Sequence, residues 1–67
     1  MKIALFPGSF DPFTRGHEAI VRQALTLFDK VVVAIGENVG KNSLLSTEER
    51  IKLIERLYAN DERVEAI

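Results

Sequence analysis

The chain has 67 residues, a formal net charge of -1 and no cysteine, and 46% of its residues are hydrophobic. Without cysteine it forms neither a disulfide nor a thiolate zinc site, and its single histidine excludes a histidine-rich metal cage. The near-neutral charge argues against a general nucleic-acid binder, which usually carries a basic stripe. The apolar runs are far shorter than the roughly 18 residues of a membrane span, and no signal peptide is visible. We therefore expect a cytoplasmic protein that binds neither nucleic acid nor membrane.

The first half of the chain predicts a strand, a glycine-bearing loop and a helix. Residues 2–6 form a short apolar run typical of a buried strand. From Glu18 to Phe28, apolar residues recur on one helical face: Ile20, Val21, Ala24, Leu25 and Phe28. The only histidine, His17, lies between these two elements, directly after Gly16. A loop between the end of a strand and the start of a helix exposes backbone N–H groups and the positive end of the helix dipole, so it attracts phosphate.

The second half repeats this alternation. The β-branched run of residues 31–36 lacks polar alternation, which predicts a central parallel strand buried on both faces. Ser46 with Glu49 three residues later is the capping-box signature of a helix start, and apolar residues follow at helical spacing: Ile51, Ile54, Leu57 and Tyr58. Residues 63–67 then alternate like the beginning of a third strand.

The order strand, helix, strand, helix, strand predicts an α/β fold: a Rossmann-like parallel sheet with β-α-β-α-β order, incomplete at its C-terminus. Ligands of such sheets bind outside the carboxyl ends of the strands, where both long loops of this chain are expected. Two nucleotide-binding motifs are excluded. Gly8 and Gly16 are too far apart for a dinucleotide fingerprint. In residues 36–42 the glycines are one residue too close for a P-loop, and Asn42 replaces the required serine or threonine.

The stretch Pro7-Gly8-Ser9-Phe10-Asp11-Pro12-Phe13-Thr14-Arg15-Gly16-His17 resembles the T/H-x-G-H signature of the nucleotidyltransferase superfamily. Within that superfamily it is most similar to the bacterial phosphopantetheine adenylyltransferases, which have P-G-[ST]-F-D-P-x-T-x-G-H here. Residues 41–50 resemble the lysine-bearing loop and the [ST]-x-E-E-R helix start of the same family. The resemblance covers residues 1–67, which it identifies as the amino-terminal part of a single nucleotidyltransferase domain.

This resemblance implies adenylyl transfer from ATP to 4′-phosphopantetheine, giving dephospho-coenzyme A and pyrophosphate, with Mg²⁺ accompanying ATP. It also implies the site residues. His17 matches the catalytic histidine that contacts the ATP phosphates, Ser9 and Phe10 match positions that touch ATP, and Ser9 and Lys41 match positions that bind the acceptor substrate. No metal-binding residue is assigned. The family further implies a homohexamer.

The family's later Gly-Leu-Arg element and serine-rich loop do not occur in these residues, so we expect the 67 residues alone to be inactive. Two alternatives stay open at this point. One is an adenylyl- or cytidylyltransferase with another acceptor, although Asp11-Pro12-Phe13-Thr14 fits neither the nicotinamide-nucleotide nor the cytidylyl relatives. The other is a nucleotide-binding module without catalysis.

Each site residue also has a purely structural interpretation. His17 alone would suit a helix cap or a solvated surface group, Ser9 a turn, and Lys41 a solvated loop. Because a helix start disfavours an imidazolium, we predict a neutral His17 that donates a hydrogen bond.

Four further side chains have predicted structural roles. We expect Thr14 to cap or brace the first helix and Asp11 to fix the shape of the loop. Glu48 and Arg50 are interpreted as the charged surface of the second helix.

Overall fold

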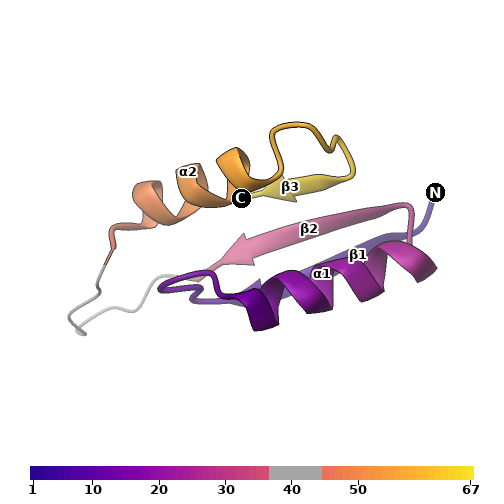
Figure 1. Cartoon of the computed structure of the whole chain (residues 1–67), viewed down its shortest axis with the longest axis horizontal. Helices are drawn as coiled ribbons and strands as arrows, with labels where there is room; N and C mark the ends of the chain where they lie inside the picture. Colours follow the sequence, from indigo (N-terminus) through magenta and orange to yellow (C-terminus); the bar gives the residue numbers. More distant parts are fainter. Residues whose placement is uncertain (37–44) are drawn as a thin grey trace.

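The computed structural model describes residues 1–36 and 45–67. Its elements follow the predicted order, and they are listed here with their bounds: β1 (Ile3–Gly8), α1 (Arg15–Leu27), β2 (Lys30–Ile35), α2 (Thr47–Leu57) and β3 (Val64–Ala66) (Figure 1). The α/β class and the β-α-β-α-β order are confirmed. In these two ranges neither helix has the length and apolar character needed to cross a membrane.

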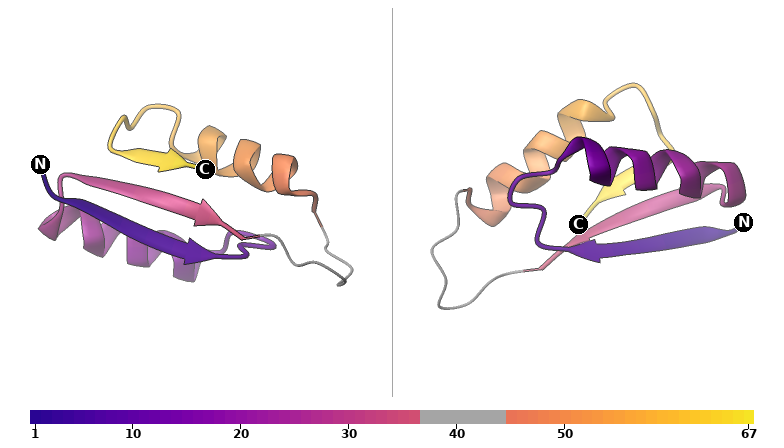
Figure 2. Two further views of the ribbon diagram at one scale, coloured as in Figure 1. Left: turned by 180° about the vertical axis from the view of Figure 1, so that it is seen from behind. Right: turned by 60° about the horizontal axis from the view of Figure 1, so that its bottom comes forward.

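The three strands form one parallel sheet in the order β1-β2-β3. Each strand is added on the same side of the one before it, so both crossovers run in the same direction across the sheet. Because parallel crossovers are right-handed, both helices then lie on the same face. Figure 2 shows this arrangement in its right-hand view, where both helices lie over the strands. In the register, Gly8 lies opposite Ile35, so β1 and β2 end together at one edge of the sheet.

The hydrophobic core lies between the helices and the central strand. Val31 and Val33 of β2 are completely buried, and they pack with Val21 of α1, Ile54 of α2 and Phe10 of the loop after β1. Of the predicted α1 face, Ala24 and Leu25 pack against this cluster, whereas Ile20 and Phe28 stay partly exposed at its margin. The expectation of a central parallel strand is therefore correct, but the expected burial on both faces is not: only Val31 and Val33, on the face that the helices cover, are fully buried.

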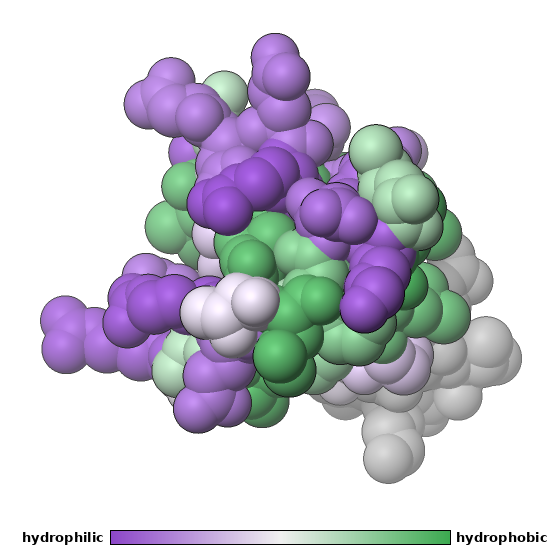
Figure 3. All heavy atoms as spheres, turned by 90° about the vertical axis from the view of Figure 1, so that its right-hand side faces the viewer, coloured by the Kyte–Doolittle hydropathy of each residue, from purple (hydrophilic) through white to green (hydrophobic). Residues whose placement is uncertain are grey.

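The opposite face of the sheet carries no helix in the described residues. Side chains alternate along a strand, so Ile3 and Leu5 of β1 point away from the core, and they are 54% and 64% exposed. On the same face Lys30 of β2 pairs with Glu65 of β3 at 2.9 Å. Hydrophobic side chains are also exposed at the end of the molecule that Figure 3 faces, where hydrophilic side chains surround them.

Element bounds differ from the expected ones where tertiary contacts extend them. β1 continues to Gly8 because Pro7 and Gly8 lie opposite Ala34 and Ile35 of β2, and an edge strand tolerates proline. α1 begins at Arg15 rather than near Glu18, because Thr14 caps it as predicted. The predicted capping box of Ser46 and Glu49 is confirmed at the start of α2.

Candidate functional site

The loop of residues 9–14, here called the β1–α1 loop, lies at the carboxyl edge of the sheet. Phe10 has a φ of 50°, and the Asp11–Pro12 peptide is cis. Thr14 has extended backbone and is the N-cap of α1. The Gly36 N–H donates to the Gly8 carbonyl oxygen at 2.9 Å, which holds the ends of β1 and β2 together beneath the loop.

Burial of the Phe10 ring determines how the β1–α1 loop folds. Phe10 is only 3% exposed, although it lies in a loop. Its ring packs against Phe6 at 4.9 Å and Phe13 at 5.6 Å between ring centroids. A Cβ atom on Gly8 would come within 2.9 Å of the Phe10 ring, so the absence of a side chain there lets the ring enter the core.

His17 lies in an aromatic pocket at the start of α1. Its imidazole is centred 4.9 Å from the Phe10 ring and 5.4 Å from the Phe13 ring, and the residue is half-buried. The Thr14 N–H donates to Nδ1 at 2.9 Å, and the Thr14 hydroxyl lies 3.0 Å from the same atom. Since Nδ1 accepts a backbone hydrogen bond, a neutral ring carries its proton on Nε2. In this tautomer Nε2–H is the ring's hydrogen-bond donor.

The same contact makes His17 part of a helix cap. Its side chain occupies the third helical position and accepts from the N-cap, as a glutamate or glutamine does in an ordinary capping box. The cap interpretation is therefore confirmed. The predicted contact with ATP phosphates stays a prediction, which Nε2 permits because it has no partner in the described residues. In the described part of the chain the N–H groups of Arg15 and Gly16 also lack an acceptor, so α1 presents donors and the positive end of its dipole beside this ring.

The other predicted site residues are placed as follows. Ser9 is exposed at the start of the β1–α1 loop, and its hydroxyl has no partner among residues 1–36 and 45–67. Phe10 follows it and contacts His17 through its ring. Lys41 lies outside the described residues. The structure thus brings Ser9, Phe10 and His17 to one loop and one helix start.

Arg50 corrects the expectation of a charged helix surface. It is only 2% exposed and donates to the Ser9 carbonyl oxygen at 2.7 Å, a contact across 41 positions of sequence. The physical reason is that backbone carbonyls at the ends of β1 and β2 face α2, and no sequence pattern reports them. The [ST]-x-E-E-R resemblance already included this arginine, which was the available signal.

Asp11 fixes the loop as predicted. Its Oδ1 accepts from the Leu45 N–H at 2.9 Å, which joins the β1–α1 loop to the residue preceding the cap of α2. Two separate contacts, those of Asp11 and Arg50, therefore connect this loop to the amino-terminal end of α2.

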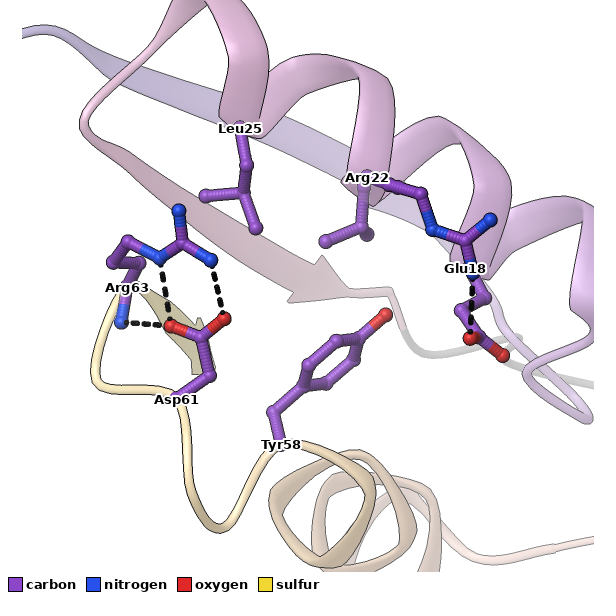
Figure 4. Close-up of a pocket in the computed structure, with 7 residues that line it drawn as sticks. Glu18, Arg22, Leu25, Tyr58, Asp61 and Arg63 are labelled. Carbon is purple, nitrogen blue, oxygen red and sulfur yellow. Dashed lines mark hydrogen bonds and ion pairs between the residues drawn. The ribbon is translucent and has the colours of Figure 1, made fainter.

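A second concave feature lies away from this loop. A cavity of about 200 Å³ opens between α1 and the turn after α2, as Figure 4 shows; it is lined by Glu18, Val21, Arg22, Leu25, Tyr58, Asp61 and Arg63. Arg22 is exposed and pairs with Glu18 at 3.2 Å. The side-chain hydrogen bond from Arg63 holds the pKa of Asp61 below its usual range. These charges are paired, so the cavity offers no free charged group to a ligand.

Tyr58 also lines this cavity, and its polar group, unlike the charged groups above, is not paired in the described residues. Its hydroxyl is buried, points toward α1 in Figure 4 and has no hydrogen-bond partner in the described residues. Burial, together with the negative charge of Glu18, raises the pKa of this hydroxyl above its ordinary value. The phenol is therefore kept neutral at a cost in unmet hydrogen bonding.

Fold and site together define a class: an α/β protein that presents helix N–H donors, a serine and a histidine at the carboxyl edge of a parallel sheet. The family model described as cytidylyltransferase-like matches residues 5–67. The chain belongs to this cytidylyltransferase-like family.

Curated relatives share about half of the residues. The phosphopantetheine adenylyltransferase of Phocaeicola vulgatus is 52% identical over 64 residues, covering 96% of this chain and 42% of the relative. The protein of the same name from Cytophaga hutchinsonii is 55% identical over 64 residues, covering 96% of this chain and 43% of the relative. That of Rhodopseudomonas palustris is 56% identical over 57 residues, covering 85% and 34%. The chain thus spans about two fifths of the length of the first two relatives.

Gly8→Ala should destabilise the full-length protein by about 1–3 kcal/mol, because the new methyl group would overlap the Phe10 ring. Gly16→Ala is the matched control. A Cβ there meets only the Thr14 hydroxyl at 3.6 Å, and alanine in a helix is more stable than glycine by roughly 0.5–1 kcal/mol. Thermal unfolding would measure both. Equal stability of the two variants would contradict the packing of Phe10 described above.

Tyr58→Phe should leave stability unchanged at pH 7 or raise it by up to about 1 kcal/mol, because the removed hydroxyl has no hydrogen-bond partner in the part of the chain that the structure describes. It should also reduce the loss of stability in alkali. An unfolded tyrosine releases its proton near pH 10. The native hydroxyl holds its proton to higher pH, so stability falls as pH rises above that value. Unfolding curves between pH 7 and 11 test this, and a clear destabilisation at pH 7 would reveal a partner for the hydroxyl.

Proposed function

We propose that the full-length protein transfers the adenylyl group of Mg·ATP to 4′-phosphopantetheine, giving dephospho-coenzyme A and pyrophosphate. The observation that carries this proposal is the Thr14–His17 contact, which occupies Nδ1 and leaves Nε2, without a partner in residues 1–36 and 45–67, beside the N–H groups that begin α1. The names of the curated relatives support the choice of acceptor. Since this chain spans only part of those relatives, the remaining length of the protein would complete the site.

In the proposed reaction a phosphate oxygen of the acceptor attacks the α-phosphorus of ATP. A new P–O bond forms, the bond to the β-phosphate oxygen breaks, and pyrophosphate leaves with its electron pair. No covalent intermediate on the protein is required, so the protein acts by positioning and by charge stabilisation. His17 Nε2–H donates to the phosphate oxygens as negative charge shifts toward the leaving group. Ser9 and Lys41 bind phosphate oxygens of the substrates, as the resemblance implies.

Mg²⁺ enters this proposal as part of the substrate Mg·ATP. In residues 1–36 and 45–67 no three histidine, cysteine, aspartate or glutamate side chains are grouped to hold a metal ion. Mg²⁺ often keeps several waters and is held largely by substrate phosphates, which suits such a surface. When bound, it would neutralise part of the charge of the triphosphate.

Gly16 supports the placement of phosphate at this helix start. Packing within the protein does not demand a glycine there, since a Cβ atom would make only an ordinary contact with Thr14. A glycine at the second position of α1 also costs helix stability. We attribute it to close approach of a ligand to the backbone, which a side chain would hinder.

The relatives' names imply nothing about assembly or location, so the oligomeric state rests on the resemblance and the location on the expectation from the sequence. We propose a cytoplasmic homohexamer. Light scattering of the full-length protein would measure its mass, and a monomeric mass would refute the hexamer without affecting the proposed reaction.

The substrate assignment is tested with the full-length protein, Mg·ATP and a panel of acceptors. We expect pyrophosphate release with 4′-phosphopantetheine, and only background release with nicotinamide mononucleotide or glycerol 3-phosphate. Mass spectrometry of the nucleotide product identifies the bond formed. Faster turnover of another acceptor would move the protein to a different transferase, and tight ATP binding without pyrophosphate release would indicate a non-catalytic module.

The role of His17 is tested by separating its cap from its donor. His17→Ala removes both and should lower kcat by about 100-fold or more, the usual cost of losing one transition-state donor. His17→Gln keeps a side-chain acceptor for the Thr14 N–H, because glutamine is an ordinary capping-box residue. It should therefore melt like the parent while losing at least about tenfold in kcat.

Asp29→Ala is the control for the loss of a side-chain hydrogen bond to the backbone alone, because its carboxylate accepts from the Lys2 N–H at 2.7 Å beside the amino ends of β1 and β2, away from the β1–α1 loop. It should lower stability by about 1 kcal/mol with little change in kcat. A His17→Gln protein with parental kcat would show that His17 serves only as a cap.

A further inference from the structure

Arg50 is a buried charge whose hydrogen bonds converge on the β1–α1 loop. Besides the Ser9 carbonyl oxygen at 2.7 Å, Nη1 donates to the Gly36 carbonyl oxygen at 3.3 Å. Nε donates to the Ser46 carbonyl oxygen at 3.3 Å, and Nη2 donates to the Thr47 hydroxyl at 3.1 Å. The guanidinium thus links the ends of β1 and β2 to the first turn of α2.

This arrangement is costly for stability alone. A buried guanidinium loses its hydration, and within the described residues no carboxylate forms an ion pair with it. Its acceptors are backbone carbonyls and one hydroxyl. An apolar side chain could fill the same space on α2, as Ile54 does one turn further along the helix. The retained charge therefore calls for a reason beyond packing.

The reason lies in the peptide group that joins Ser9 and Phe10. This group is planar and trans, so its carbonyl oxygen and its N–H point in opposite directions. Arg50 binds the Ser9 carbonyl oxygen and thereby turns the Phe10 N–H away from α2. In the described residues that N–H has no hydrogen-bond acceptor. The left-handed backbone of Phe10, with φ of 50°, needs such external support.

We propose that Arg50 is a positioning residue that holds the Ser9–Phe10 peptide with the Phe10 N–H available to a phosphate oxygen of the nucleotide. This inference rests on the proposed function. The amide would join the free N–H groups of Arg15 and Gly16 and the His17 Nε2–H as a set of donors for one polyphosphate. Arg50 itself stays behind the loop and does not touch the nucleotide.

The test uses the full-length protein and two probes, Mg·pyrophosphate and adenosine, whose affinities are measured by titration calorimetry. Arg50→Met should weaken pyrophosphate binding about tenfold or more, the loss typical of a hydrogen-bond donor to a charged group. Adenosine binding should stay within twofold of the parent. Arg56→Met is the matched control, since Arg56 is an exposed arginine of the same helix, and it should leave both affinities unchanged.

Two more variants distinguish position from charge and guard against misfolding. Arg50→Lys keeps the charge but cannot hold all four acceptors, so its pyrophosphate affinity should lie between those of the parent and Arg50→Met. Thr47→Val removes one acceptor and leaves the guanidinium in place, and it should weaken pyrophosphate binding about threefold even if Arg50→Met does not fold.

Parental pyrophosphate binding by Arg50→Met, by Arg50→Lys or by Thr47→Val would overturn the inference, as would equal losses for pyrophosphate and adenosine. These readouts need no acceptor substrate. Formation of dephospho-coenzyme A by the parent reports on the proposed function separately.

Discussion

Burial of one aromatic ring in a loop is the constraint from which the rest of this site follows. The Phe10 ring enters the core between β1 and α1, and this requires both the missing side chain of Gly8 and a left-handed backbone at Phe10 itself. Once buried, the ring forms a wall of the pocket that holds His17. The hydrophobic core therefore sets the position of the polar groups, and the loop behaves as an extension of the core rather than as a surface connection.

Much of the fold follows from the sequence because local and global preferences agree. The β-branched run of β2 predicts a central strand, although only its helix-covered face is fully buried in the described residues, and the capping box at Ser46 locates α2. The bounds of β1 did not follow, because Pro7 and Gly8 read as turn residues and become strand only through pairing with β2. The placement of Ser9, Phe10 and His17 around one helix start follows from the order of strand, loop and helix. The detailed roles do not.

Arg50 illustrates what periodicity leaves out. An arginine one turn into a helix, between charged neighbours, has the pattern of a solvated residue. Its burial depends on carbonyl groups contributed by Ser9 and Gly36, which every residue type possesses and which therefore leave no trace in composition. Tyr58 is a second case, since helical spacing predicts its apolar ring in the core but not its buried hydroxyl, which has no partner in the described residues. A single sequence does not show which side chains will contact backbone groups.

The shared use of His17 by the cap of α1 and by the candidate site has a consequence for protein engineering. Because Nδ1 is held by the Thr14 backbone, the direction of Nε2 is set by where the helix begins and not by the histidine alone. Grafting this imidazole onto a different scaffold would require transplanting the helix start from Thr14 onward, together with the aromatic pocket around it. Conversely, an inserted residue between Thr14 and His17 would rotate the Nε2 donor away even with every side chain retained. The three-residue spacing is therefore as necessary to this geometry as the histidine itself.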